Sequence, residues 1–149
     1  MAQTAAVQRQ INAIRKKLNA ALSDVMSIAA RSVHANLTDD PLATETGTPV
    51  DTGWSYTNWL TTVGTPITSP LGSKRNVPFG THETLSDALS SYRYSPSTAV
   101  IFISNNVPYI NELNQGPQYS PQQRPGFVQR AIVQTLTVDL PGALGNRYG

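Results

Sequence analysis

The stretch that decides the fold is residues 7–35, VQRQINAIRKKLNAALSDVMSIAARSVHA. Apolar or small side chains recur in it at alternating steps of four and three residues, the spacing of a heptad repeat. These positions are Val7, Ile11, Ile14, Leu18, Ala21, Val25, Ile28, Ser32 and Ala35, with Leu22, Ala29 and Val33 widening the line into a stripe. No glycine or proline interrupts residues 2–40. The pattern therefore predicts one long helix over residues 5–37.

The length of this helix has a consequence for assembly. At 1.5 Å per residue, about 32 residues span roughly 48 Å. A chain of 149 residues and 16.1 kDa is too small to cover a helix of that length. Part of the apolar stripe should therefore contact another chain. We expect a subunit interface at the first apolar positions of the helix, Val7, Ile11, Ile14 and Leu18.

Charge is unevenly placed, although the net charge is only +2 and charged residues make up only 13% of the chain. The first 36 residues hold five basic side chains and one carboxylate, Asp24. This asymmetry indicates contact with DNA or with an acidic partner, and the sequence leaves the two open. The candidate residues are Arg9, Arg15, Lys16, Lys17 and Arg31 in the helix, and Lys74 and Arg75 in a later loop.

The middle of the chain reads as short elements joined by loops. Two runs predict strands, residues 60–64 and the β-branched run 98–104. Between them lie an extended loop over residues 64–82, rich in Gly, Pro and Ser, and a short helix over residues 84–94. A second short helix is expected at residues 109–113.

The chain closes with a helix over residues 126–140. Its apolar face is predicted at Phe127, Ala131, Ile132, Leu136 and Leu140. We expect Pro141 and Gly142 to stop it and to leave residues 141–149 as a loose tail. The whole predicts a single α+β domain over residues 1–149. In this domain the long N-terminal helix and the C-terminal helix pack on a small, mostly antiparallel sheet.

Several function classes lack support in the sequence. With no cysteine, the chain has no disulfide, thiolate metal site or cysteine nucleophile. His34 and His82 are too far apart in sequence for the short spacing of a zinc site. Neither a Gly-x-Ser-x-Gly elbow nor a phosphate-binding glycine loop occurs. No apolar run is long enough to span a membrane, and we expect no cofactor.

One triplet suggests an enzyme. Asp51-Thr52-Gly53 matches the aspartic-protease triplet, and a small homodimeric protease would supply one aspartate per chain. The residues before it do not form the apolar strand that such an enzyme needs, so we interpret Asp51 as a helix cap. The protease remains an alternative, as does a helical adaptor that dimerises through residues 5–35.

Two segments together resemble a known family. Pro49-Val50-Asp51-Thr52-Gly53, followed by Ser55 and Trp59, resembles the P-V-D-T-G-x-L…S-W opening of phage tail-completion and neck proteins. Residues 101–116, IFISNNVPYINELNQG, resemble their v-x-I-x-N-x-x-P-Y-A-x-x-v-E-x-G motif. The segment QRPGFV at residues 123–128 is similar to the start of their final helix. In order and spacing the resemblance covers about residues 5–140.

The resemblance implies a structural virion protein and not an enzyme. Such a subunit would form a ring that joins the phage head connector to the tail, after assembly in the cytoplasm of the bacterial host. Its partners would be copies of itself, neighbouring neck, connector and tail proteins, and packaged DNA touched without sequence specificity, with no role for a membrane. Tyr109 and Glu112, in the second motif, would add to the subunit interface.

Overall fold

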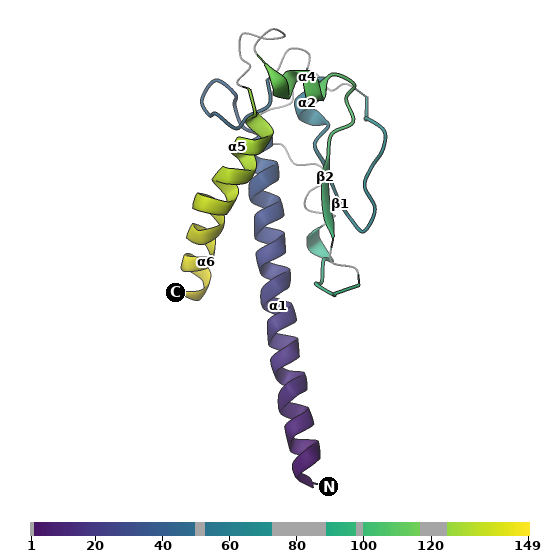
Figure 1. Ribbon diagram of the computed structural model, residues 1–149, viewed down its shortest axis with the longest axis vertical. Coiled ribbons are helices and arrows are strands. Elements are labelled where there is room, and N and C mark those ends of the chain that lie inside the picture. Colours follow the sequence, from purple (N-terminus) through teal and green to yellow (C-terminus); the bar gives the residue numbers. More distant parts are fainter. Residues whose placement is uncertain (1, 50–52, 73–88, 98–99, 117–124) are drawn as a thin grey trace.

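The computed structural model describes residues 2–49, 53–72, 89–97, 100–116 and 125–149. One helix, α1 (Ala2–Thr38), runs the length of the molecule, and the other elements gather around its C-terminal half (Figure 1). The N-terminal part of α1 projects alone from this body. The architecture is α+β, and the long helix predicted over residues 5–37 is confirmed.

A two-stranded sheet lies on one side of α1. Strand β1 (Leu60–Val63) pairs antiparallel with β2 (Ile101–Ser104), with Leu60 opposite Ser104 and Val63 opposite Ile101. A one-turn helix, α2 (Trp54–Thr57), precedes β1, and α4 (Ile110–Gln115) follows β2. Both predicted strands and the second short helix are therefore present, with shifted ends.

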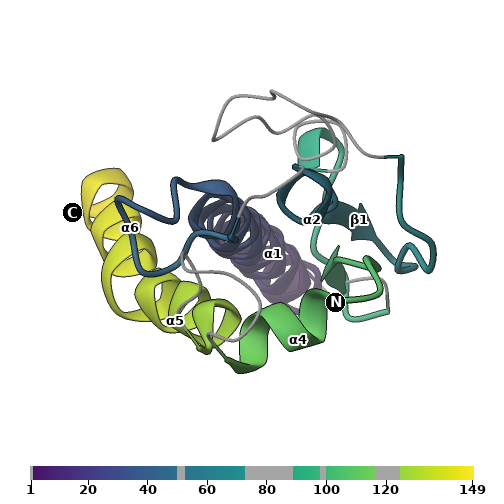
Figure 2. The same cartoon turned by 90° about the horizontal axis from the view of Figure 1, so that it is seen from above.

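The C-terminal helix lies on the other side of α1. It consists of α5 (Phe127–Gln134), a π-helical turn η1 (Thr135–Asp139) and α6 (Leu140–Tyr148). Seen down the long axis, α1 stands between this helix and the sheet (Figure 2). The C-terminal helix thus packs mainly on α1 and approaches the sheet only near its start, where Phe127, Trp59 and Ile103 share a cluster.

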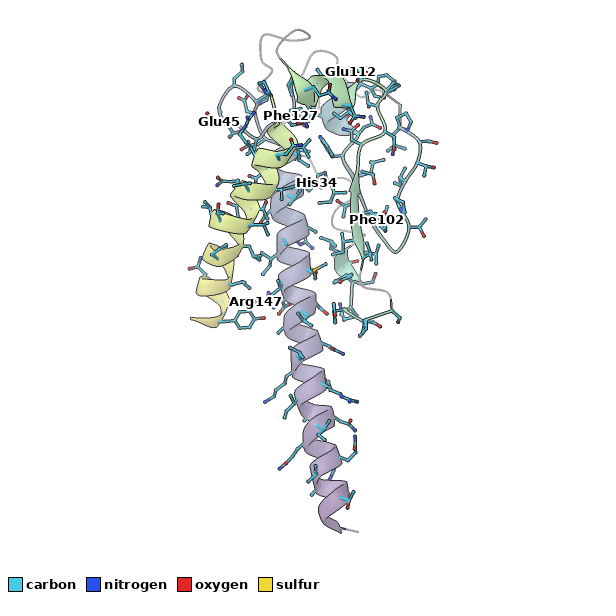
Figure 3. All side chains as sticks on the ribbon, in the orientation of Figure 1. His34, Glu45, Phe102, Glu112, Phe127 and Arg147 are labelled. Atoms are coloured by element: carbon cyan, nitrogen blue, oxygen red, sulfur yellow. The ribbon has the colours of Figure 1, made fainter. Side chains whose placement is uncertain are left out.

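The loose tail predicted for residues 141–149 is wrong, because the helix continues through them to Tyr148. In η1 the N–H of Leu140 donates to the carbonyl of Thr135, five residues back. This wide turn starts a new helical segment, and Pro141 falls in its first turn, where the missing N–H is tolerated. Arg147 then anchors the last turn by an ion pair with Asp24 of α1, 2.8 Å long (Figure 3).

The π turn itself is held by a side chain of α1. Asn36 donates from Nδ2 to the carboxylate of Asp139 at 2.7 Å and to the hydroxyl of Thr135 at 3.1 Å. Ala131 and Thr135 are fully buried against α1, one turn apart. The turn after Thr135 is the π-helical turn η1, which contains one residue more than an α-helical turn. The extra residue changes which side chains face α1, and it brings Asp139 to Asn36 and then Leu140 towards α1.

The core lies where the three layers meet. Its main cluster comprises Leu37, Trp59, Leu113, Phe127 and Ala131, and a smaller one comprises Ala30, Leu89 and Tyr92. Buried polar atoms are paired across elements. The indole Nε1 of Trp59 donates to the Thr48 hydroxyl at 2.7 Å, and that hydroxyl donates to the carbonyl of Leu37 at 2.7 Å. The loop after α1 is thereby tied to the start of β1.

Some predictions fall outside the described residues. The proposed cap Asp51 lies there, as do residues 84–88 of the helix predicted over residues 84–94. Leu89 and Ser90 are helical, but residues 91–94 are not, so the predicted end of this helix is wrong. Within the loop predicted at residues 64–82, the described residues 64–72 contain neither helix nor strand. In the parts of the chain that the structure describes, no helix is both long and apolar enough to cross a membrane.

Candidate assembly interface

The N-terminal projection of α1, residues 4–20, is exposed along its whole length, and we call it the stem. Four large apolar side chains line one side of it. Their exposed fractions are 54% for Val7, 39% for Ile11, 65% for Ile14 and 56% for Leu18. The structure therefore brings the four predicted interface residues of the helix onto one uncovered stripe, because steps of three and four residues return to the same helix face.

The same stripe is partly covered further along α1. Its members from Ala21 to Val33 are half-buried and Ala35 is exposed, whereas the buried residues Ala30 and Leu37 lie beside the stripe. The chain's own C-terminal helix covers one side of this half and ends partway down α1 (Figure 1), whereas Ala30 packs with Leu89 and Tyr92. Its last contacts reach Asp24, through Arg147 and through the Tyr148 hydroxyl, which donates to Oδ2 of Asp24 at 2.7 Å. Below that level the stripe continues without any cover from its own chain.

The hydrogen bond to Asp24 raises the pKa of the Tyr148 phenol above its ordinary value of 10.0, with partial desolvation adding to the effect. The neutral phenol is the form that donates to the carboxylate. The hydrogen bond between Tyr148 and Asp24, at the end of the C-terminal helix, is consequently intact at neutral pH.

The stem is strongly basic. It carries Arg9, Arg15, Lys16 and Lys17 and no carboxylate. On a wheel of about 100° per residue, Arg15 and Lys17 flank the apolar stripe, whereas Arg9 and Lys16 lie opposite it. An apolar line edged by positive charge is the surface that a partner with apolar side chains and carboxylates would match.

The other predicted contact residues do not join the stem. Arg31 is exposed on the covered half of α1, and Lys74 and Arg75 lie outside the described residues. Tyr109 and Glu112 are exposed at the opposite end of the molecule, where the ring of Tyr109 meets that of Trp54 edge-on at 5.8 Å (Figure 3). If they serve assembly, they do so at a second surface.

Sequence reasoning missed an apolar surface on the C-terminal helix. Ile132 and Leu136 were predicted to face inward, but they are 43% and 57% exposed, and Val133 beside them is 57% exposed. We call these three residues the C-terminal patch. In the structure Phe127, Ala131 and Thr135 form the inward face of the helix at steps of four. Because Thr135 is polar, the apolar pattern alone does not mark this face.

A pocket of about 470 Å³ borders this patch. It lies between the loop after α1 and the C-terminal helix, and Val133 is part of its wall. Two carboxylates, Asp39 and Glu45, line it together with one cation, Arg130. The Arg130 guanidinium donates to main-chain carbonyls of Glu45 and Pro125. Among the described residues of its lining, carboxylates thus outnumber cations, and they lie next to exposed apolar side chains.

A metal site and the protease alternative place different requirements on the described residues. Among them, no group of three or more His, Asp or Glu side chains is placed to hold a metal ion. His34 is a buried residue of α1. Asp51, on which the protease alternative rests, lies outside them. The arrangement suits binding between surfaces.

Comparison of the chain with protein-family models, with curated proteins and with solved structures finds no match.

Proposed function

We propose that the chain is a structural subunit of a tailed-phage neck, which assembles as a ring between the head connector and the tail. The observation that carries the proposal is the stem, 17 residues of helix with four large apolar side chains that their own chain leaves exposed. The two motifs at residues 49–59 and 101–116 add the resemblance to neck and tail-completion proteins.

The energetics of the stem favour assembly. An isolated helix shorter than about 12–15 residues is marginal in water, and most helix stability comes from packing of an apolar face. Burying one large apolar side chain contributes about 1.5–3 kcal/mol. Covering Val7, Ile11, Ile14 and Leu18 would therefore stabilise an assembled state, because the lone chain leaves 39–65% of their surface exposed.

Charge argues against the adaptor alternative, in which two stems pair with each other. Arg15 and Lys17 occupy the positions that flank the seam in a coiled coil, and the stem has no carboxylate to pair with them. In a stem dimer, positive side chains would approach each other along the seam. The partner of the stem is better sought on a different surface.

The first test introduces charge on the stripe. Ile11→Asp with Ile14→Asp should leave the fold intact, because both side chains lie outside the core, and should leave the chain monomeric in sedimentation. Asn12→Asp with Ala13→Asp is the matched control, since it adds the same charge to the same turns away from the stripe. Unchanged assembly of the stripe variant would discard this interface.

Location and DNA contact are tested separately. Gold-labelled antibody should mark the neck of purified virions, and labelling that is absent from virions would contradict the function. If the basic stem residues face packaged DNA, affinity for non-specific duplex should fall steeply with salt through counterion release. A flat salt response would leave the basic residues to a protein partner.

A further inference from the structure

We propose that the stem of one subunit docks on the C-terminal patch of the next, with Arg15 and Lys17 directed to the acidic pocket beside that patch. This inference rests on the proposed ring and names the contact that builds it. The stem supplies an apolar stripe edged by positive charge, and the receiving surface supplies Ile132, Val133 and Leu136 beside Asp39 and Glu45.

The two surfaces match in character. Each presents large apolar side chains that are mostly between 39% and 65% exposed. Each also carries charge at the edge of its apolar part, and the signs are opposite. Asp39 is exposed, and its Oδ1 accepts the N–H of Asp40 at 2.9 Å. Such complementarity selects partner and register as well as adding affinity.

A stem in this pocket belongs to a second copy. Arg15 and the pocket residue Asn36 lie on the same continuous helix, 21 residues apart. At 1.5 Å per residue this separates them by about 31 Å. A straight helix cannot fold back on itself, so a stem never reaches the pocket of its own chain.

The contact joins two different surfaces, and this determines how copies can propagate. Each subunit gives its stem to one neighbour and its patch to the other, which is a heterologous contact. If the α1 helices of neighbours were parallel, each step would shift the chain along its own axis and build an open filament. A closed ring requires each α1 helix to lie roughly in the plane of the ring and to point from its own subunit to the next.

Complementary charge reversals test the contact. The stem variant carries Arg15→Glu and Lys17→Glu, and the pocket variant carries Asp39→Lys and Glu45→Lys. Each alone places like charges in contact and should weaken self-association by about tenfold or more at low salt. In an equimolar mixture the acidic stem meets the basic pocket, and the native stem meets the native pocket. The mixture should therefore recover assembly with alternating subunits, as measured by sedimentation velocity.

Controls separate folding from contact. Arg9→Glu with Lys16→Glu changes the same charge on the opposite side of the stem and should assemble like the native chain. Circular dichroism and thermal unfolding verify that each variant is folded. If the pocket variant does not fold, Asp39→Asn with Glu45→Gln replaces it and should weaken association several-fold at low salt. That difference should disappear at high salt, because only screened charges have been removed.

Three outcomes would overturn the contact. They are a native chain that stays monomeric at the highest soluble concentration, a stem variant that assembles normally but loses affinity for duplex DNA, and a mixture that fails to recover. The inference and the proposed function can fail independently. Recovery in the mixture with no label in virions would keep the contact and reject the neck. Antibody label at the neck, together with charge-reversal variants that assemble fully, would keep the neck function and reject the contact.

Discussion

The two halves of α1 share a sequence pattern but differ in surroundings. Residues 21–38 lie between the C-terminal helix and the sheet (Figure 2), whereas residues 4–20 project beyond both and are exposed (Figure 1). The apolar stripe continues across both halves with the same spacing. Helical periodicity therefore identifies an apolar face, and only the fold shows that its second half is partly covered within the chain, while Ala30 and Leu37 beside it are buried.

The largest expected contrast is between two leucines of α1. Leu37 is 1% exposed in the main core cluster, and Leu18 is 56% exposed on the stem. Leu37→Ala should lower the free energy of unfolding by about 2–5 kcal/mol, because it removes buried methyl groups and leaves a cavity. Leu18→Ala should cost less than about 0.5 kcal/mol. Urea unfolding at concentrations where the chain is monomeric measures both free energies. Equal losses in the two variants would contradict the difference in burial between the two halves of α1.

A smaller effect is expected where the covered half meets the loop that follows it. Thr48 is fully buried and its hydroxyl joins Trp59 to the carbonyl of Leu37. Thr48→Val should destabilise by about 1–3 kcal/mol, since it leaves the indole N–H without its acceptor. Thr137→Val, at an exposed site on the C-terminal helix, is the control. Denaturation followed by Trp fluorescence measures both, and a Thr48 variant as stable as the control would contradict this bonding.

Asn36 tests how the C-terminal helix is held on α1. Asn36→Ala removes its bonds to Thr135 and Asp139 and should cost about 1–3 kcal/mol, with faster amide exchange from residue 135 onward. Asn12→Ala on the stem removes only a bond from Gln8 and should leave those amides unchanged. Equal exchange in the two variants would show that the π turn does not depend on Asn36.

The smallest effect concerns pH. The pKa of Tyr148 is raised, chiefly by its hydrogen bond to Asp24, so the folded state favours the neutral phenol. Its contribution is fully present below the ordinary pKa of 10.0 and is lost as the pH rises through the raised value.

Amide exchange in α6 should therefore accelerate above about pH 10 beyond the base-catalysed trend. Tyr148→Phe should lack this step, while burial raises the pKa of Tyr56 and Tyr92 alike in both proteins. An identical pH profile for the two chains would contradict the role of this hydrogen bond.

The parts of the fold that follow from local pattern could be predicted. The heptad spacing and the absence of Gly and Pro specified α1, and its length implied an uncovered stem. The β-branched run before Asn105 specified β2. In each case neighbouring residues determine the element, since propensity and periodicity act over a few residues.

Features set by distant partners could not be predicted. The π turn depends on Asn36, about a hundred residues earlier, and it carries the helix past Pro141. The C-terminal patch also went unnoticed, because a helix with apolar residues on two faces has no single inward side until its neighbour is known. The acidic pocket arises only when the loop after α1 meets the C-terminal helix.

Hydrogen exchange along α1 tests the central claim most directly. In dilute solution, amides of residues 4–20 should exchange much faster than those of residues 21–38, because an uncovered helix opens easily. On assembly at high concentration the stem should become protected to a similar degree as the covered half. A stem that exchanges at the same fast rate at every concentration would show that no other copy covers it, and would contradict the account.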